Sequence, residues 1–204
     1  MLRAFLLSAS AVVVIYAANA ASGPPFPLPG PPPVALLSSL TGNYGVTSKS
    51  VCLFSRGGFD PNFQAIGTNV FSSSFADEGI WTFNGDGTGT AKNLNVGLGV
   101  PPTPGFQPNA SSVSTTFSFT YTVNADGTFT VDTVPGTFLG TALIGSRAGQ
   151  TQTIVNRATL TGLISKSGDT LTIATLTPRV TTSTWSNGDV LIQVCNRSGV
   201  LIKL

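Results

Sequence analysis

The chain contains no histidine, and its only methionine is Met1. Histidine is the side chain that titrates near neutral pH and that most often binds zinc, copper or haem iron through nitrogen. A Ser-His-Asp triad, a Cys-His pair and every histidine-ligated metal or haem site are therefore excluded for this chain alone. We expect neither a metal nor a cofactor.

Charged residues are also scarce, at 9% of the chain. Without the expected leader described below, nine basic residues stand against eight acidic ones. No field of one sign is present to attract nucleic acid or anionic lipid, so we expect no nucleic-acid partner. The solvent-facing surface must consist of Thr, Ser, Asn and Gly, a composition that is common in exported β proteins.

Cysteine is limited to Cys52 and Cys195, which are too few for a thiolate zinc site. In an exported chain an even pair of cysteines indicates a disulfide, and the alternative is two separate buried thiols. The bond would connect an early strand to a late one across 142 residues. Closing a loop of that size stabilises the folded chain by about 5 kcal/mol at most.

The amino terminus has the pattern of a secretory leader. Arg3 precedes a mostly apolar run over 4–18, which ends at the small-x-small sequence Ala18-Asn19-Ala20. The run is shorter than the roughly 20 residues that a membrane-spanning helix needs. We therefore predict a signal peptide over 1–20, no membrane span after its removal, and a periplasmic or extracellular location.

Proline marks two segments that cannot belong to regular sheet. Residues 23–33 are dominated by Pro and Gly, which favours an extended polyproline conformation, so 21–39 is predicted to be a tether. A second proline-rich stretch over 101–108 is predicted to be a surface loop. The remainder, 40–204, is long enough for a single β domain with its own core.

Alternation with a period of two dominates this domain. From Thr116 to Val123, aromatic and aliphatic residues alternate with Thr and Ser, which predicts a half-buried strand. The strand ends in the turn 124–127, and the alternation resumes at Thr128. The same turn pattern, Asn-x-Asp-Gly-Thr-x-Thr, occurs at 84–90, so two hairpins of one kind are predicted.

Further hairpins follow towards the carboxyl terminus. One joins 159–164 to 171–174, and another is predicted to turn at 196–199 between 190–195 and 200–202. With strands at 51–54 and 179–185, the total is about ten short strands. The expected fold is all-β, an antiparallel meander closing into a small barrel, with a β-sandwich as the alternative. At most one short helix is expected, within 62–77.

The two repeated hairpins, over 79–90 and 121–128, carry a resemblance. They are similar to those of small exported bacterial proteins of unassigned role, whose fold is lipocalin-like or allene-oxide-cyclase-like. The resemblance covers roughly 40–204 and implies a calycin-like barrel. It implies no functional residue, because none is established for such proteins.

Calcium and acid-base catalysis were tested against the spacing of the acidic residues. The Asn-x-Asp-Gly turns lack the closing carboxylate that an EF-hand loop requires, so turns without metal are expected. Asp77 and Glu78 are adjacent, and adjacent residues of a strand point to opposite faces. We therefore do not expect an enzyme.

One group of aromatic residues could line a pocket. On neighbouring predicted strands these are Trp81, Phe83, Phe117, Phe119 and Tyr121. They predict a small apolar ligand or a surface partner, although an aromatic stripe at strand spacing is also what a packed core requires. Two other hypotheses are a structural surface subunit and an eight-stranded outer-membrane barrel.

Overall fold

The structure is a computed structural model that describes residues 39–100 and 109–204. The predicted leader, the tether up to residue 38 and the proline-rich loop over 101–108 lie outside the described residues. Within these ranges the protein is all-β and contains no α-helix.

Eleven strands form one antiparallel sheet. The five long ones are β1 (Thr41–Ser55), β2 (Val70–Asn84), β3 (Thr88–Val100), β4 (Asn109–Val123) and β11 (Val190–Lys203). The six short ones are β5 (Thr128–Thr133), β6 (Leu139–Ile144), β7 (Thr151–Val155), β8 (Leu160–Ile164), β9 (Thr170–Ala174) and β10 (Val180–Trp185).

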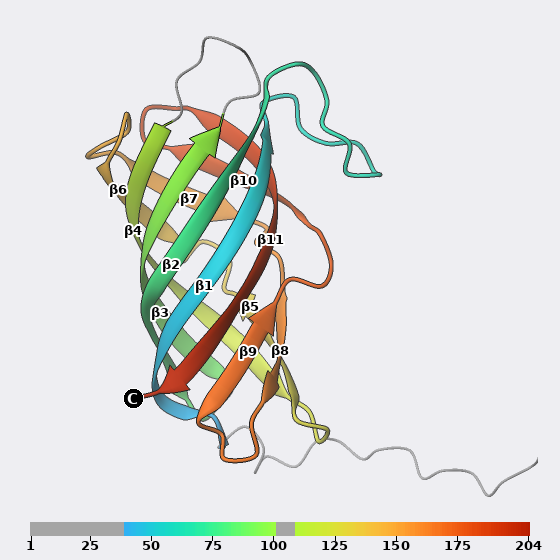
Figure 1. Cartoon of the computed structure of the whole chain (residues 1–204), viewed down its shortest axis with the longest axis vertical. Helices are drawn as coiled ribbons and strands as arrows, with labels where there is room; N and C mark the ends of the chain where they lie inside the picture. Colours follow the sequence, from blue (N-terminus) through green and yellow to red (C-terminus); the bar gives the residue numbers. More distant parts are fainter. Residues whose placement is uncertain (1–38, 101–108) are drawn as a thin grey trace, which may run out of the picture. The chain divides into compact units, whose positions relative to one another are not determined.

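The sheet closes because β1 pairs on one side with β2 and on the other with β11. The resulting ring contains eight strands, and Figure 1 shows β1 between β2 and β11. This confirms the predicted antiparallel meander that closes on itself, whereas a two-sheet sandwich would leave the first and last strands unpaired. Closure also removes the free sheet edges that would otherwise template aggregation.

Three neighbouring positions of the ring are each occupied by two short strands. β5 and β6 both pair with β4, β9 and β10 both pair with β11, and β7 and β8 lie between them. The backbone between the halves, over 134–138, 156–159 and 175–179, is irregular. All three breaks lie near the middle of the long strands, so one wall of the ring is interrupted at half its height.

The two ends of the ring differ. We name the end with the tight turns 85–87, 124–127 and 165–169 the turn end, and the end with connections 56–69, 145–150 and 186–189 the loop end. The repeated turns at the turn end have the same hydrogen bonds. Asp86 Oδ1 and Asp126 Oδ1 each accept from the backbone N–H two residues later, at 2.9 Å in both turns.

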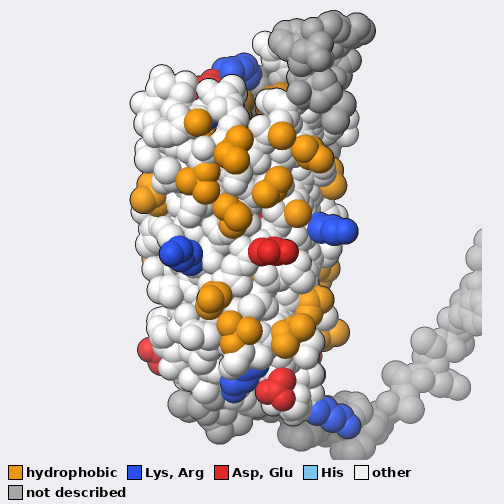
Figure 2. All heavy atoms as spheres, turned by 60° about the vertical axis from the view of Figure 1, so that its left-hand side comes forward, with side chains coloured by type: hydrophobic (Ala, Val, Ile, Leu, Met, Phe, Trp, Pro, Cys, Tyr) orange, Lys and Arg blue, Asp and Glu red, His pale blue; other side chains and the backbone are white. Residues whose placement is uncertain are grey.

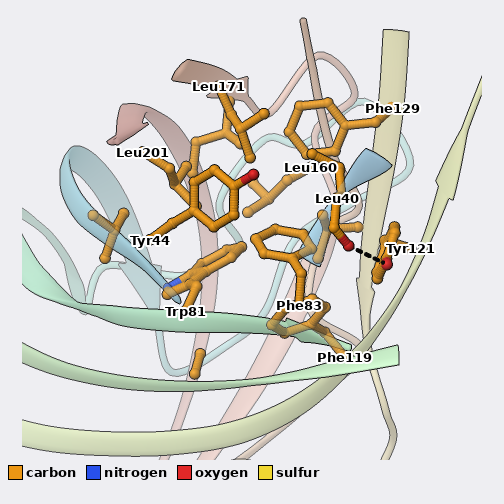
Figure 3. Close-up of a cluster of buried hydrophobic side chains, with 14 of the residues drawn as sticks. Leu40, Tyr44, Trp81, Phe83, Phe119, Tyr121, Phe129, Leu160, Leu171 and Leu201 are labelled. Atoms are coloured by element: carbon orange, nitrogen blue, oxygen red, sulfur yellow. Dashed lines mark hydrogen bonds between the residues drawn. The ribbon is translucent and has the colours of Figure 1, made fainter. Parts of the chain in front are cut away.

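In the half of the ring nearer the turn end, the interior is a packed aromatic core. Its largest fully buried side chains include Trp81, Tyr44, Phe83, Phe119 and Phe129. The rings meet edge-on, as in the pair Tyr44 and Phe83 with centroids 5.2 Å apart. Figure 3 shows these rings turned towards one another from opposite walls of the ring.

The helix predicted within 62–77 is wrong. Residues from Val70 onward belong to β2, and Phe71, Ser73, Phe75 and Asp77 face inward in alternation with exposed residues. The small polar residues between the two phenylalanines weakened the alternating pattern in the sequence. The β-ladder with β1 extends over all 15 residues of β2 and decides the conformation.

The turn predicted at 196–199 is also wrong, because β11 continues without interruption from Val190 to Lys203. Gly199 is not needed there for a turn. A Cβ at this position would lie 2.5 Å from Ser48 Cβ and 2.7 Å from the Thr47 carbonyl oxygen. Glycine therefore allows β11 to approach β1 closely at this point.

Cys52 and Cys195 are direct partners in the pairing of β1 with β11, and they form a disulfide. Their Cα atoms are 4.1 Å apart, and Cys52 is buried. The bond therefore lies inside the ring at the junction where the sheet closes. A disulfide is compatible with an exported protein.

Candidate functional site

A cavity of about 230 Å³ occupies the half of the ring nearer the loop end. Its floor is the top of the aromatic core, where Trp81, Phe117 and Phe138 line it. Its walls include the disulfide and two inward phenylalanines, Phe54 and Phe75. Exposed residues of the loop end also line the cavity, so it reaches the protein surface.

The five predicted aromatic residues divide between cavity and core. Trp81 and Phe117 line the cavity. Phe83, Phe119 and Tyr121 do not line it and lie in the buried core below. The Tyr121 hydroxyl donates a hydrogen bond to the Leu40 carbonyl oxygen at 2.8 Å (Figure 3).

A row of polar side chains crosses three neighbouring strands, and two of its members, Asp77 and Asn95, line the cavity. Ser48, Asp77 and Asn95 are partners across β1, β2 and β3, and all three face inward. Asp77 accepts a hydrogen bond from Ser48 Oγ at 3.1 Å and another from Asn95 Nδ2 at 2.5 Å. The carboxylate is thus held by donors on both sides.

Arg197 supplies the positive charge for this row. Its Nη2 lies 3.7 Å from Asp77 Oδ2, and the two side chains are 16% and 5% exposed. Glu78, the neighbour of Asp77, is exposed, so the two carboxyl groups point to opposite faces of β2, as predicted. Among the described residues that line the cavity, Asp77 is the only one with a carboxyl group, so the cavity has no facing pair of acids for acid-base chemistry.

Arg157 enters the cavity from the break between β7 and β8. Asn156, directly before it, has a φ of 56°, a left-handed conformation that asparagine tolerates better than most residues. The Arg157 guanidinium carbon lies 4.6 Å from the Phe117 ring centroid and 4.9 Å from that of Phe138. Both rings therefore offer their faces to the cation.

One nitrogen of the Arg157 guanidinium is not satisfied by a hydrogen bond. Its Nη1 is buried and has no hydrogen-bond partner among residues 39–100 and 109–204. Burial is the largest cause that lowers the pKa of Arg157, and the like charge of Arg197 adds to it. Asp77 opposes the shift, and the resulting pKa is about 9. The group still carries its proton at neutral pH.

A second charged group lies at the loop end of the ring, and of its members only Arg147 lines the cavity. Asp189 accepts from Arg56 Nη1 at 2.6 Å and from Arg147 Nη2. Burial alone would raise the pKa of Asp189, but these two hydrogen bonds hold it below its usual range. Arg147 lies over the ring of Trp185, 4.9 Å from its centroid, and Trp185 Nε1 is buried with no partner within the described ranges.

The charged residues of the cavity were not predicted as site residues from the sequence. The period-2 alternation carried a signal for two of them. Asp77 falls on the same face of its strand as Trp81, and Arg197 on the same face as Cys195, and both of these faces point inward. The turn predicted over Arg197 concealed its phase, and Asp77 was compared only with its neighbour Glu78. Nothing in the local pattern indicates that Arg157, which lies in irregular backbone, points inward.

No group of three or more metal-binding acids or cysteines occurs in the part of the chain that the structure describes. That part also contains no helix long and apolar enough to cross a membrane. No protein-family model matches the chain, and no curated protein matches it in sequence.

Proposed function

We propose that this is an exported, non-enzymatic binding protein that holds a small molecule inside its ring of strands. The observation that carries the proposal is the cavity of about 230 Å³ above the aromatic core. Small-molecule sites are concave and mostly apolar, with a few polar groups that orient the ligand. The cavity combines an aromatic floor with such groups on its walls.

The volume limits the size of the ligand. A dry cavity of about 150 Å³ accommodates benzene, so 230 Å³ corresponds to a ligand of about one ring with a short chain. A longer ligand could extend towards the loop end, where the cavity reaches the surface. The ring closure and the disulfide favour a preformed site, which reduces the entropic cost of binding.

A periplasmic or extracellular location belongs to the same proposal. It is supported by the leader pattern over 1–20 and by the disulfide between Cys52 and Cys195. Fractionation of the native host, with the chain detected in the soluble exported material, is the expected result.

The membrane-spanning alternative has weaker support. Outer-membrane barrels expose an apolar band about 25 Å tall. Here Lys49 and Glu78 lie at mid-height on the outer face, and Figure 2 shows charged side chains there as well as towards both ends. From Lys49 to Arg56 the chain rises roughly 18 Å at a typical strand tilt, which is too short for such a band.

Partner binding by the outer face is the second candidate function. It is favoured by apolar side chains that are exposed on the long strands, among them Val51, Leu94, Val96 and Leu98. Figure 2 shows apolar side chains spread over one face of the ring. Sedimentation of the purified chain would test self-association, and a strict monomer would count against a structural subunit.

A cavity-filling variant tests the proposed function. Ala142 is buried and lines the cavity, so Ala142→Phe should occupy the space that a ligand needs. Ala76, on the outer face of β2, provides the matched control Ala76→Phe. The probes are 3-phenylpropionate, 3-phenylpropanol and 3-phenylpropylamine, which share one apolar body.

Thermal unfolding with each probe is the measurement. At least one probe should raise the Tm of the wild type and of Ala76→Phe, because a ligand of the folded state stabilises it. The same probe should have no effect on Ala142→Phe. If none of the three raises the Tm of the wild type, the proposed function is wrong.

A further inference from the structure

The unsatisfied polar atoms of the cavity are all of one kind. Arg157 Nη1 and Trp185 Nε1 are buried, belong to cavity-lining residues and have no partner in the described part of the chain. Both are donors, and an indole or guanidinium nitrogen cannot accept. A ligand that satisfies them must therefore supply acceptors.

The charged side chains of the cavity also favour a ligand that supplies acceptors. Four arginines and one acid line it in the described ranges. Arg197 is paired with Asp77, and Arg147 with Asp189. Neither Arg157 nor Arg179 forms an ion pair with a described residue, but Arg179 is exposed to solvent. The positive charge of Arg157, at the cavity floor, is therefore left without an ion-pair partner.

The rings beneath Arg157 do not replace that counter-ion. Phe117 and Phe138 contact the face of the guanidinium, whereas its N–H groups point outward in the guanidinium plane. A buried charge without hydrogen-bonding partners costs stability. A binding site can retain such a group because the ligand completes it.

Resting on the function proposed above, we infer that the ligand is a small carboxylate with an aryl or alkyl body. Its carboxylate accepts from Arg157, and its body lies against Trp81 and Phe138 on the cavity floor. A planar carboxylate fits the fork of an arginine.

The experiment compares the acid, alcohol and amine of one body by calorimetry at pH 7. We expect 3-phenylpropionate to bind the wild type about ten- to a hundredfold more tightly than 3-phenylpropanol, the range of one charge-assisted hydrogen bond. Arg157→Met should reduce the affinity for the acid to that for the alcohol. Lys166→Met, an exposed charge removal at the turn end, should change neither.

Each other outcome has one meaning. If the alcohol binds as tightly as the acid, the inference is wrong and the proposed function stands; if no probe binds, the proposed function itself fails. If Arg157→Met keeps the preference for the acid, Arg157 is not the anchor and the inference is wrong. Circular dichroism checks that Arg157→Met folds. The second variant, Arg157→Gln, keeps hydrogen-bond donors without the charge and should also lose the preference for the acid.

Discussion

Asp77 on β2 and Arg197 on β11 place opposite charges 3.7 Å apart inside the ring. The two strands are not neighbours, because β1 lies between them. The pair therefore joins two walls of the cavity across the strand at which the sheet closes. Ser48 of that intervening strand also donates to the carboxylate.

We expect Asp77→Ala to be strongly destabilising. It removes the only cavity-lining carboxylate among the described residues. Arg197 and Arg157 then share a cavity that no acidic side chain lines. Breaking a buried pair in this way costs about 3–5 kcal/mol in the free energy of unfolding. Urea denaturation is the measurement, and Glu78→Ala, one residue away on the exposed face, should stay within about 0.5 kcal/mol of the wild type.

Arg157→Met should have the opposite effect on the ligand-free protein. The substitution removes a buried charge whose Nη1 has no partner in the described ranges, and it retains an unbranched apolar side chain against Phe117 and Phe138. Replacing such a charge by a hydrophobic group stabilises by about 1–3 kcal/mol. We expect a higher Tm without ligand together with weaker binding of 3-phenylpropionate, because residues of a binding site often retain function at a cost in stability. A lower Tm would mean that the guanidinium is satisfied in the folded state.

The same residue predicts a dependence of stability on alkaline pH. Burial, together with the like charge of Arg197, lowers the pKa of Arg157 to about 9 in the folded state, well below that of an ordinary guanidinium in the unfolded chain. Between these values the unfolded chain binds more protons, so the contribution of this group to the free energy of unfolding rises with pH. The advantage of Arg157→Met over the wild type should therefore shrink between pH 8 and pH 10.5 in urea denaturation. A constant difference would contradict the lowered pKa.

The sequence predicted the parts of the fold that depend on local pattern. The hairpins at 84–87 and 124–127 follow from turn residues between alternating strands, and both are confirmed. Closure of the sheet followed from hairpin succession. These features need no knowledge of distant residues.

The charged site could not be predicted in the same way. Arg157 lies in the break over 156–159, where no periodicity indicates which side chains point inward. Phe138, one of the two rings beneath it, belongs to the break over 134–138. Their contact depends on three breaks being at one height, which follows from the register of β4 and β11 and not from any local segment.

The repeated turns provide an internal comparison for an acid titration. Hydrogen bonds from the hydroxyl and the backbone N–H of Thr88 lower the pKa of Asp86, and Thr128 lowers that of Asp126 in the same way. We expect both carboxyls to titrate below the ordinary 3.8 in NMR. Thr88→Val should raise the pKa of Asp86 and leave Asp126 unchanged. A shift of both would mean that a longer-range field, and not the turn, sets these values.

Gly199 tests whether β11 is one strand. If 196–199 were a turn at the surface, Gly199→Ala would be tolerated or mildly unfavourable. In the continuous strand an alanine Cβ would lie 3.0 Å or less from three atoms of Thr47 and Ser48, two of them backbone. Since β1 cannot move without disturbing its pairing with β2, we expect a loss of about 1–3 kcal/mol in urea denaturation, the usual cost of overpacking. Gly45→Ala on β1 is the matched control, because its nearest neighbour, at 3.2 Å, is the end of the Leu204 side chain, which can turn away. Equal small losses in both variants would contradict the close approach of β11 to β1.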